Sequence, residues 1–141
     1  MAKVVNVRLV DHSDEVIRAL ESQVEAALEA VGQQCVSHAK SNITSAGRVD
    51  TGALRNSMTH QVVLSEKAVY VGTNSEYAIY NEFGTGIHAE GGKGRQTPWT
   101  YQDAKGNFHR TRGMKPIHFL KNAAADHVDE YRSIVKKYLS D

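Results

Sequence analysis

The chain has 141 residues, 40% of them hydrophobic, and its 17 lysines and arginines nearly balance 16 aspartates and glutamates. This length suits one domain that folds without a disulfide or metal, and the charge balance excludes a uniformly basic nucleic-acid binder. Because it has a single cysteine, no signal-peptide-like start and no stretch near the roughly 20 apolar residues of a membrane span, we expect a soluble protein made in a reducing cytoplasm.

The first third of the chain predicts a strand followed by one long helix. Residues 4–10 are rich in valine and alternate imperfectly, which is typical of a strand. Ser13 is a candidate N-cap, and apolar residues then recur at helical spacing across residues 13–45. Gly32 is the weak point of this helix. We interpret the apolar stripe, with Cys35 as a small buried group in it, as a core face; a partner-binding helix is the alternative.

A short turn and a hairpin are expected next. Asp50 or Thr51 is positioned to cap a helical turn that carries Leu54 inward. Apolar and polar residues alternate over 58–64, and a second β-rich run covers 68–72, so the two segments predict an antiparallel hairpin.

The segment 77–83 predicts a short helix that ends at Gly84. Its large side chains share one helical face, whether this is counted as Tyr77, Tyr80 and Phe83 or as Ile79 and Phe83.

A basic, glycine-rich insertion follows over residues 84–115. It contains six lysines and arginines against two carboxylates, a net charge of +4, and seven of the eleven glycines. We expect its start, including 89–97, to be mobile. Residues 99–102 and 107–111 flank a turn and predict a small β-hairpin, with Gly106 at a positive φ.

The last segment predicts one amphipathic helix that begins with Pro116 at its first position. Together these elements predict a single α+β domain over residues 1–141. A long N-terminal helix and a C-terminal helix pack on a small antiparallel sheet, and the 84–115 insertion extends from them.

The usual signatures of catalysis and cofactor binding are absent from the sequence. In the run 91–94 a glycine follows the lysine where a phosphate-binding loop needs a hydroxyl, and Gly84 and Gly86 lack the third glycine of a dinucleotide fingerprint. Seven histidines include no pair spaced by four, and there is no Cys-x-x-Cys. We therefore predict no catalytic residue, no cofactor and no metal site.

The insertion has the ingredients of an interface. Its cations suit phosphates or an acidic neighbour, and its aromatic side chains suit stacking on bases or packing on another subunit. The candidates for contact with a neighbour or with DNA in a lumen are Lys93, Arg95, Trp99, Lys105, Arg110 and Arg112.

Three blocks in fixed order carry a family resemblance: VDTGALRNS at 49–57, YAIYNEFGTG at 77–86 and GMKPIHFLKNA at 113–123. They match a Thr-Gly-x-Leu-Arg-x-Ser block, a Tyr-Ala-x-Tyr-x-Glu-x-Gly-Thr block and a Pro-x-x-Phe-Leu segment. The chain thus resembles the neck or tail-completion proteins of long-tailed double-stranded DNA phages, a family labelled after the tenth gene product of a lambda-like Hong Kong phage. The matching positions include Thr51, Gly52, Leu54, Tyr77, Tyr80, Glu82, Gly84, Pro116 and Phe119.

The resemblance implies a non-enzymatic virion protein, from an active phage or a prophage, made in the bacterial cytoplasm and placed at the head-to-tail junction. It implies self-association into a ring and binding to a tail terminator, head-completion or tail-tube protein, without a membrane role. The block residues are interpreted as structural: Thr51 and Ser57 cap or turn the backbone, Leu54 and Phe119 fill the core, and Glu82 pairs with Arg55 or accepts backbone hydrogen bonds. A small DNA-binding module using 84–115 in non-specific contacts is the alternative.

Overall fold

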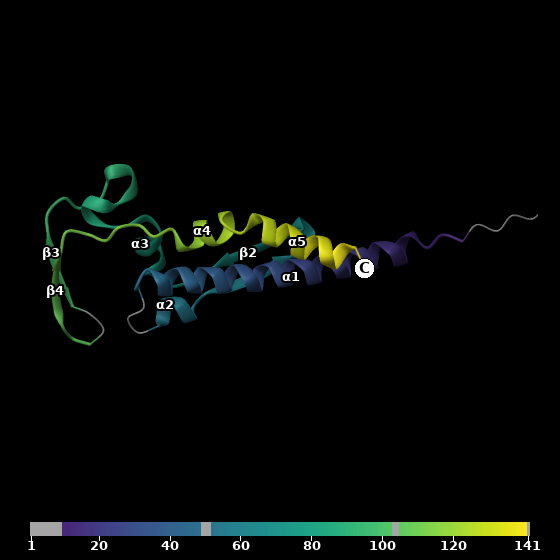
Figure 1. Ribbon diagram of the computed structural model, residues 1–141, viewed down its shortest axis with the longest axis horizontal. Coiled ribbons are helices and arrows are strands. Elements are labelled where there is room, and N and C mark those ends of the chain that lie inside the picture. The colour runs from purple at the N-terminus through teal and green to yellow at the C-terminus, as the bar shows by residue number, and fades with distance from the viewer. Residues whose placement is uncertain (1–9, 49–51, 103–104, 141) are drawn as a thin grey trace, which may run out of the picture.

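The computed structural model describes residues 10–48, 52–102 and 105–140. It is elongated, and one long helix, α1 (Ser13–Ser45), runs along much of its length (Figure 1). At 1.5 Å per residue, α1 is about 50 Å long. The predicted bounds of this helix and the α+β class are confirmed. The strand expected over 4–10 lies, except for Val10, outside the described residues.

The start of α1 differs from the prediction in the position of its N-cap. Ser13 is the first helical residue and not the N-cap; His12 occupies the cap position and makes no side-chain capping bond. The carboxylate of Asp11 accepts the backbone N–H of Ser13 at 2.8 Å and also the Ser13 hydroxyl. A side chain two residues before the helix therefore binds one of its free N–H groups.

A β-hairpin packs against the middle of α1. Its strands β1 (Thr59–Val63) and β2 (Ala68–Gly72) pair antiparallel, as predicted, through the 3₁₀ turn η1 (Leu64–Glu66). Gly32 allows the close approach, because a β-carbon there would lie 2.6 Å from His60 Cδ2 and 2.8 Å from Val69 Cγ2. His60 is held by Glu29, with Nε2 and Oε1 2.6 Å apart, so its role is structural.

The core lies between α1, α2 (Ala53–Asn56) and α4 (Phe119–Ala125). Phe119 and Ile43 are fully buried, Leu54 is 7% exposed, and Cys35 is buried as predicted. α2 begins after Gly52, which adopts a positive φ of 82°. The predicted caps Asp50 and Thr51 lie outside the described residues. At the other end of α2, Ser57 turns the backbone as expected, its hydroxyl donating to Leu54 O at 2.7 Å.

The C-terminal segment forms two helices, α4 and α5 (Val128–Leu139), where one was predicted. The expected start at Pro116 is wrong. The Ile117 N–H donates to Asn81 O at 2.9 Å and His118 has a φ of 49°, so the helix begins only at Phe119. Both helices lie along α1 (Figure 1). Among the described residues, no helix combines the length and apolarity needed to cross a membrane.

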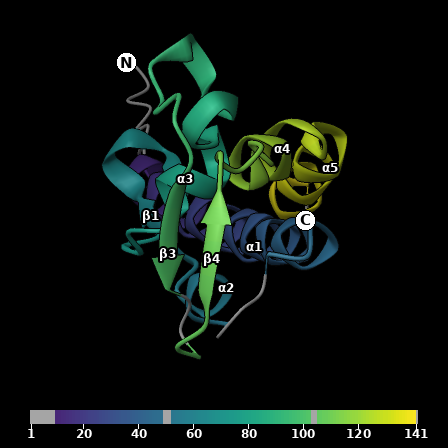
Figure 2. The ribbon, with the colours of Figure 1, turned by 90° about the vertical axis from the view of Figure 1, so that its left-hand side faces the viewer.

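The end of the molecule opposite α5 holds the remaining elements: α3 (Ala78–Phe83), the 3₁₀ turns η2 (Gly86–His88) and η3 (Glu90–Gly92), and the strands β3 (Trp99–Gln102) and β4 (Phe108–Thr111) (Figures 1 and 2). The predicted hairpin β3–β4 is confirmed, with Gly106 at φ 88°. It forms a sheet separate from β1–β2, in agreement with the prediction of a hairpin that extends from the body of the domain.

The beginning of the insertion is packed, which corrects its interpretation as a flexible exit from α3. Thr85 N–H donates to Met114 O at 2.8 Å and Ile87 N–H to Arg112 O at 3.0 Å. A β-carbon on Gly86 would lie 1.9 Å from the Arg112 carbonyl oxygen. The glycine therefore lets two backbone segments touch at the base of the β3–β4 hairpin.

Candidate interaction surface

Helix α3 turns its large apolar side chains toward solvent and its polar ones toward the body. Four large apolar side chains are between 49% and 65% exposed: Tyr77, which immediately precedes the helix, and Ile79, Tyr80 and Phe83 within it. Asn81 and Glu82 are only 7% exposed. The predicted apolar face is present, but the described residues leave it largely uncovered. We call these four apolar side chains the α3 surface; such a patch is typical of an interaction site.

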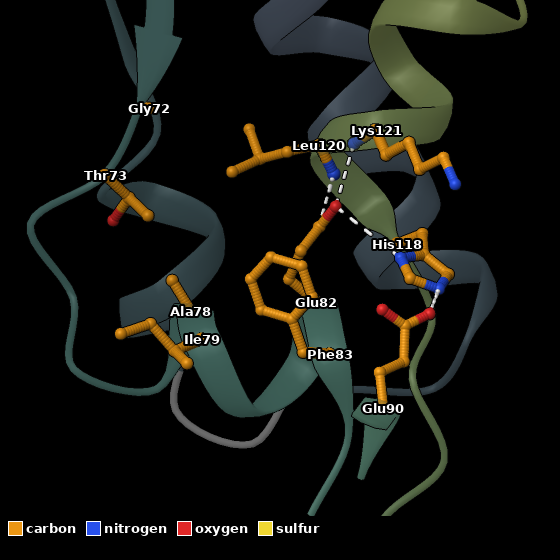
Figure 3. Close-up of a pocket in the computed structure, with 10 residues that line it drawn as sticks. All are labelled: Gly72, Thr73, Ala78, Ile79, Glu82, Phe83, Glu90, His118, Leu120 and Lys121. Atoms are coloured by element: carbon orange, nitrogen blue, oxygen red, sulfur yellow. Dashed lines mark hydrogen bonds and ion pairs between the residues drawn. The ribbon is translucent and has the colours of Figure 1, made fainter. Parts of the chain in front are cut away.

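Glu82 is buried because it caps another helix. Its two carboxylate oxygens accept the backbone N–H groups of Leu120 and Lys121, each at 2.9 Å, at the start of α4 (Figure 3). These N–H groups have no partner within α4, and a carboxylate suits the positive end of a helix. Of the two predicted roles, acceptance of backbone hydrogen bonds is confirmed, and Arg55 donates instead to Thr44 Oγ1 at 3.5 Å.

Asn81 ties α3 to two other parts of the chain. Its backbone carbonyl accepts Ile117 N–H, and its side-chain Oδ1 accepts Arg48 Nη1 at 3.1 Å. Arg48 also donates through Nη2 to Lys115 O at 2.8 Å. Partial burial lowers the pKa of the Arg48 guanidinium from its ordinary value. The orientation of α3, and hence the exposure of its apolar face, is therefore set by polar contacts from distant segments.

An open pocket of about 590 Å³ lies beside the α3 surface (Figure 3). Its walls include Ile79, Phe83, Glu82, Glu90 and His118. The His118 ring lies between the two carboxylates: Nε2 is 2.6 Å from Glu90 Oε1, and the buried Nδ1 is 3.9 Å from Glu82 Oε1, beyond hydrogen-bond distance. Phe83 meets the imidazole edge-on, with the ring centres 6.4 Å apart.

Three of the side chains that line this pocket already hold the fold together. Glu82 binds α4, Glu90 binds His118, and Thr73 Oγ1 is bonded to the Ser57 hydroxyl and to Ser75 N–H. Among the described residues that line the pocket, Thr73 carries the only hydroxyl. The arrangement suits reception of a partner's side chain between an apolar wall and a carboxylate.

The basic residues of the insertion are exposed on and around the β3–β4 hairpin. Arg95 lies over the Trp99 ring, with its guanidinium carbon 5.6 Å from the ring centre. Arg110 pairs opposite Thr100, so it lies on the other face of the hairpin from Trp99 and Tyr101. The structure thus brings Arg95 and Trp99 together and directs Arg110 elsewhere. The exposed cations among the predicted interface residues are Lys93, Arg95, Lys105, Arg110 and Arg112.

The hairpin also exposes aromatic surface. Phe108 is 73% exposed, and Tyr101 is 46% exposed and stacks on His109 with ring centres 5.2 Å apart. Phe108 is one of the aromatic residues expected to contact bases or another subunit, whereas sequence reasoning missed the pocket residues Glu90 and His118 as candidate site residues. The pocket depends on pairing between segments that no local pattern links.

The predicted apolar stripe of α1 divides into two parts. Its C-terminal half, which includes Cys35, Ala39 and Ile43, is buried as a core face. Near its start, Val16, Ile17 and Leu20 are at least half exposed. We call these three side chains the α1 surface. The core interpretation therefore holds for one half, and the other half presents an apolar face to solvent.

A comparison with protein families identifies what the chain is similar to. A family model described as "Bacteriophage HK97-gp10, putative tail-component" matches residues 8–84, more than half of the chain. The match covers α1, the β1–β2 hairpin and α3. Searches of curated proteins and of solved structures return no match.

Proposed function

The chain belongs to the HK97 gp10-like family of phage tail components, and from this premise we propose that it is a non-enzymatic virion protein of the head-to-tail junction, acting in neck assembly or tail completion. The observation that carries the proposal is the exposure of apolar side chains at both ends of an elongated molecule. A structural component works by contact, and these are the surfaces from which contact gains the most free energy.

The positions of the two surfaces support self-association into a ring. The α3 surface lies at one end of the molecule, and the start of α1, which carries the α1 surface, lies toward the other (Figure 1). Tyr138 and Leu139, at the end of α5, add exposed apolar area toward the same end of the molecule as the α1 surface (Figure 1). Two different patches on one chain form head-to-tail contacts, and these close into a ring when the rotation between neighbours allows it.

The β3–β4 hairpin is the proposed contact with other components: a tail terminator, a head-completion protein or a tail-tube protein. An isolated two-stranded hairpin is at best marginally stable in water, so exposed aromatic residues such as Phe108 favour a role completed by a neighbour. The cations around it, Lys93, Arg95, Lys105 and Arg112 among them, suit an acidic partner surface.

A mixing experiment tests head-to-tail association. Ile79→Lys alters the α3 surface, Leu20→Lys alters the α1 surface, and Tyr70→Lys changes an equally exposed apolar side chain on β2 as a matched control. By mass photometry, we expect closed rings for the wild type and the control and none for either variant alone. An equimolar mixture of the two variants retains one intact contact and gives dimers. Rings from both single variants contradict the proposal.

Imaging of particles tests the location. Negative-stain images of particles lacking the protein should show heads and tails that fail to unite productively. Complementation with the Tyr70→Lys protein should restore joining, whereas Ile79→Lys and Leu20→Lys should not. Normal joining without the protein, or its absence from mature particles, rejects a role at this junction.

The second candidate is a DNA-binding module, favoured by five exposed cations and by the stacked Arg95–Trp99 pair. Contacts to DNA phosphates make affinity fall steeply with salt, with a slope of about −0.9 per phosphate in a log–log plot. Fluorescence anisotropy with duplex DNA at rising salt separates the candidates. A steep dependence of affinity on salt that Arg110→Glu and Arg112→Glu abolish would favour DNA binding. The absence of saturable DNA binding would favour the role in protein–protein contact.

A further inference from the structure

Two histidines and a glutamate from different helices converge where α5 meets α1. His38 lies on α1, His127 is the N-cap of α5, and Glu130 lies in the first turn of α5. His38 Nε2 is 2.8 Å and His127 Nδ1 3.5 Å from the same oxygen, Glu130 Oε2. One ligand atom from each residue lies within 4.8 Å of the other two.

The two imidazoles pack against each other and against Tyr131. Their rings stack with centres 3.4 Å apart and planes 3° from parallel, and Tyr131 meets both rings edge-on. Tyr131 itself is anchored by its hydroxyl, which donates to the Ala123 carbonyl. The three side chains are 21%, 33% and 36% exposed, so they are sheltered by protein yet reachable from solvent.

We propose that His38, His127 and Glu130 form a binding site for a divalent transition-metal ion, with Zn²⁺ as the best fit. Neutral imidazole nitrogen and carboxylate oxygen are zinc's usual donors after thiolate, and three protein ligands plus a water complete a tetrahedron. At zinc–ligand distances of about 2.0–2.1 Å, the donors of a tetrahedral site lie roughly 3.3 Å apart. The two measured separations, 2.8 and 3.5 Å, bracket that value. Because the lone pair of an imidazole nitrogen lies in the ring plane and the two planes are parallel, one ring must turn out of the stack for both nitrogens to point at the ion.

Charge also favours an ion here. The carboxylate oxygen of Glu130 lies beside a nitrogen of each imidazole, and a cation bound at this point would be attracted to that carboxylate. A metal ion between the three groups would form a coordinate bond with each of them.

The consequence for the fold would be a cross-link between α1 and α5. No residue of α5 is fully buried, so this helix is held by partly buried contacts. Because the ligands come from both helices, zinc binding would stabilise the docked position of α5. Sequence reasoning predicted no metal site, since His38 is 89 residues from His127 and no spacing links them.

Zinc titration of the full-length, untagged chain tests the site. Calorimetry should show one Zn²⁺ per chain for the wild type, and zinc should raise its Tm. His38→Gln, His127→Gln and Glu130→Gln should each weaken binding by at least about tenfold and remove the Tm shift. His12→Gln is the matched control, because His12 and Glu15 form the same His-x-x-Glu pair, 3.3 Å apart, and no third ligand joins them from the described part of the chain.

A second measurement uses the wild-type protein alone, so it does not depend on the folding of variants. In NMR spectra, zinc should shift the ring signals of His38 and His127 at one equivalent and leave those of His12 unchanged. The absence of saturable zinc binding overturns the proposal. So does binding that His38→Gln and His127→Gln leave at wild-type strength, or a zinc response at other histidines only.

Discussion

Glu82 accepts the backbone N–H of Leu120 at 2.9 Å, across 38 residues of sequence, and so joins α3 to the start of α4. The other carboxylate oxygen accepts the next N–H, that of Lys121. This one side chain has two structural effects. It completes the N-terminus of α4, and it turns the apolar face of α3 outward, where the proposed ring contact forms.

Replacing Glu82 with glutamine tests this link. Glutamine has one acceptor oxygen, and its NH₂ group would face the second backbone N–H, leaving that donor unsatisfied. Because the site is buried, we expect Glu82→Gln to lower the free energy of unfolding by about 1–3 kcal/mol, measured by urea denaturation. Glu90→Gln is the control: the Glu90 side chain is 48% exposed and pairs with His118, so the loss of this pair should cost less than about 1 kcal/mol. Equal losses would contradict the account.

Gly32 provides a test in which two effects oppose each other. Alanine raises helix propensity by about 1 kcal/mol, whereas its β-carbon would lie 2.6 Å from the His60 ring and 2.8 Å from Val69. Overpacking of this kind costs about 1–3 kcal/mol, and both neighbours are fixed by the β1–β2 hairpin. We expect Gly32→Ala to lower the Tm. Gly72→Ala, where nothing lies within 4 Å of the added β-carbon, should leave the Tm nearly unchanged.

The parts of this fold that local patterns predicted are those stabilised by local interactions. The helix over 13–45 has a long periodic apolar stripe, Gly84 ends α3 as predicted, and Gly106 takes the positive φ expected of it. Leu54 and Phe119 lie in the core, as the interpretation of the family blocks predicted.

The parts that were missed depend on distant contacts. Apolar spacing continues from Ile117 through the break between α4 and α5, so the sequence predicts one helix. Its start is instead delayed by a hydrogen bond to Asn81, and a second helix begins after His127, which occupies the N-cap position. The pocket at His118 and the cluster at His38 likewise join segments far apart in sequence, and such pairings have no local signal.

The cap at the start of α1 predicts a pH dependence. Hydrogen bonds from the Ser13 hydroxyl and then the Ser13 N–H lower the pKa of Asp11 below 3.8. A lowered folded-state pKa means that the stabilisation is present above pH 3.8 and is lost as the pH falls through the folded value. We expect amide exchange in the first turn of α1 to become faster, relative to the middle of the helix, over that acidic range.

Two variants separate the charge of Asp11 from its hydrogen bond. Asp11→Asn keeps an acceptor oxygen but does not titrate, so the first turn should stay protected and the acid-dependent step should disappear. Asp11→Ala should fray the first turn at every pH. An acid-dependent step of unchanged size in Asp11→Asn would show that another group causes it.

The contact between Gly86 and Arg112 should control the position of the β3–β4 hairpin. A β-carbon on Gly86 would lie 1.9 Å from a backbone carbonyl oxygen, which cannot move unless the segments 85–87 and 112–114 separate. We expect Gly86→Ala to break the Ile87–Arg112 hydrogen bond and to change the fluorescence of Trp99, the only tryptophan. Gly91 also has a positive φ, but a β-carbon there would meet nothing within 4 Å. Gly91→Ala therefore measures the backbone strain of about 1–2 kcal/mol without the steric clash.

If the hairpin contacts head or tail components, Gly86→Ala should also impair particle joining while Gly91→Ala does not. Equal behaviour of the two variants would mean that the close packing at Gly86 does not position the hairpin.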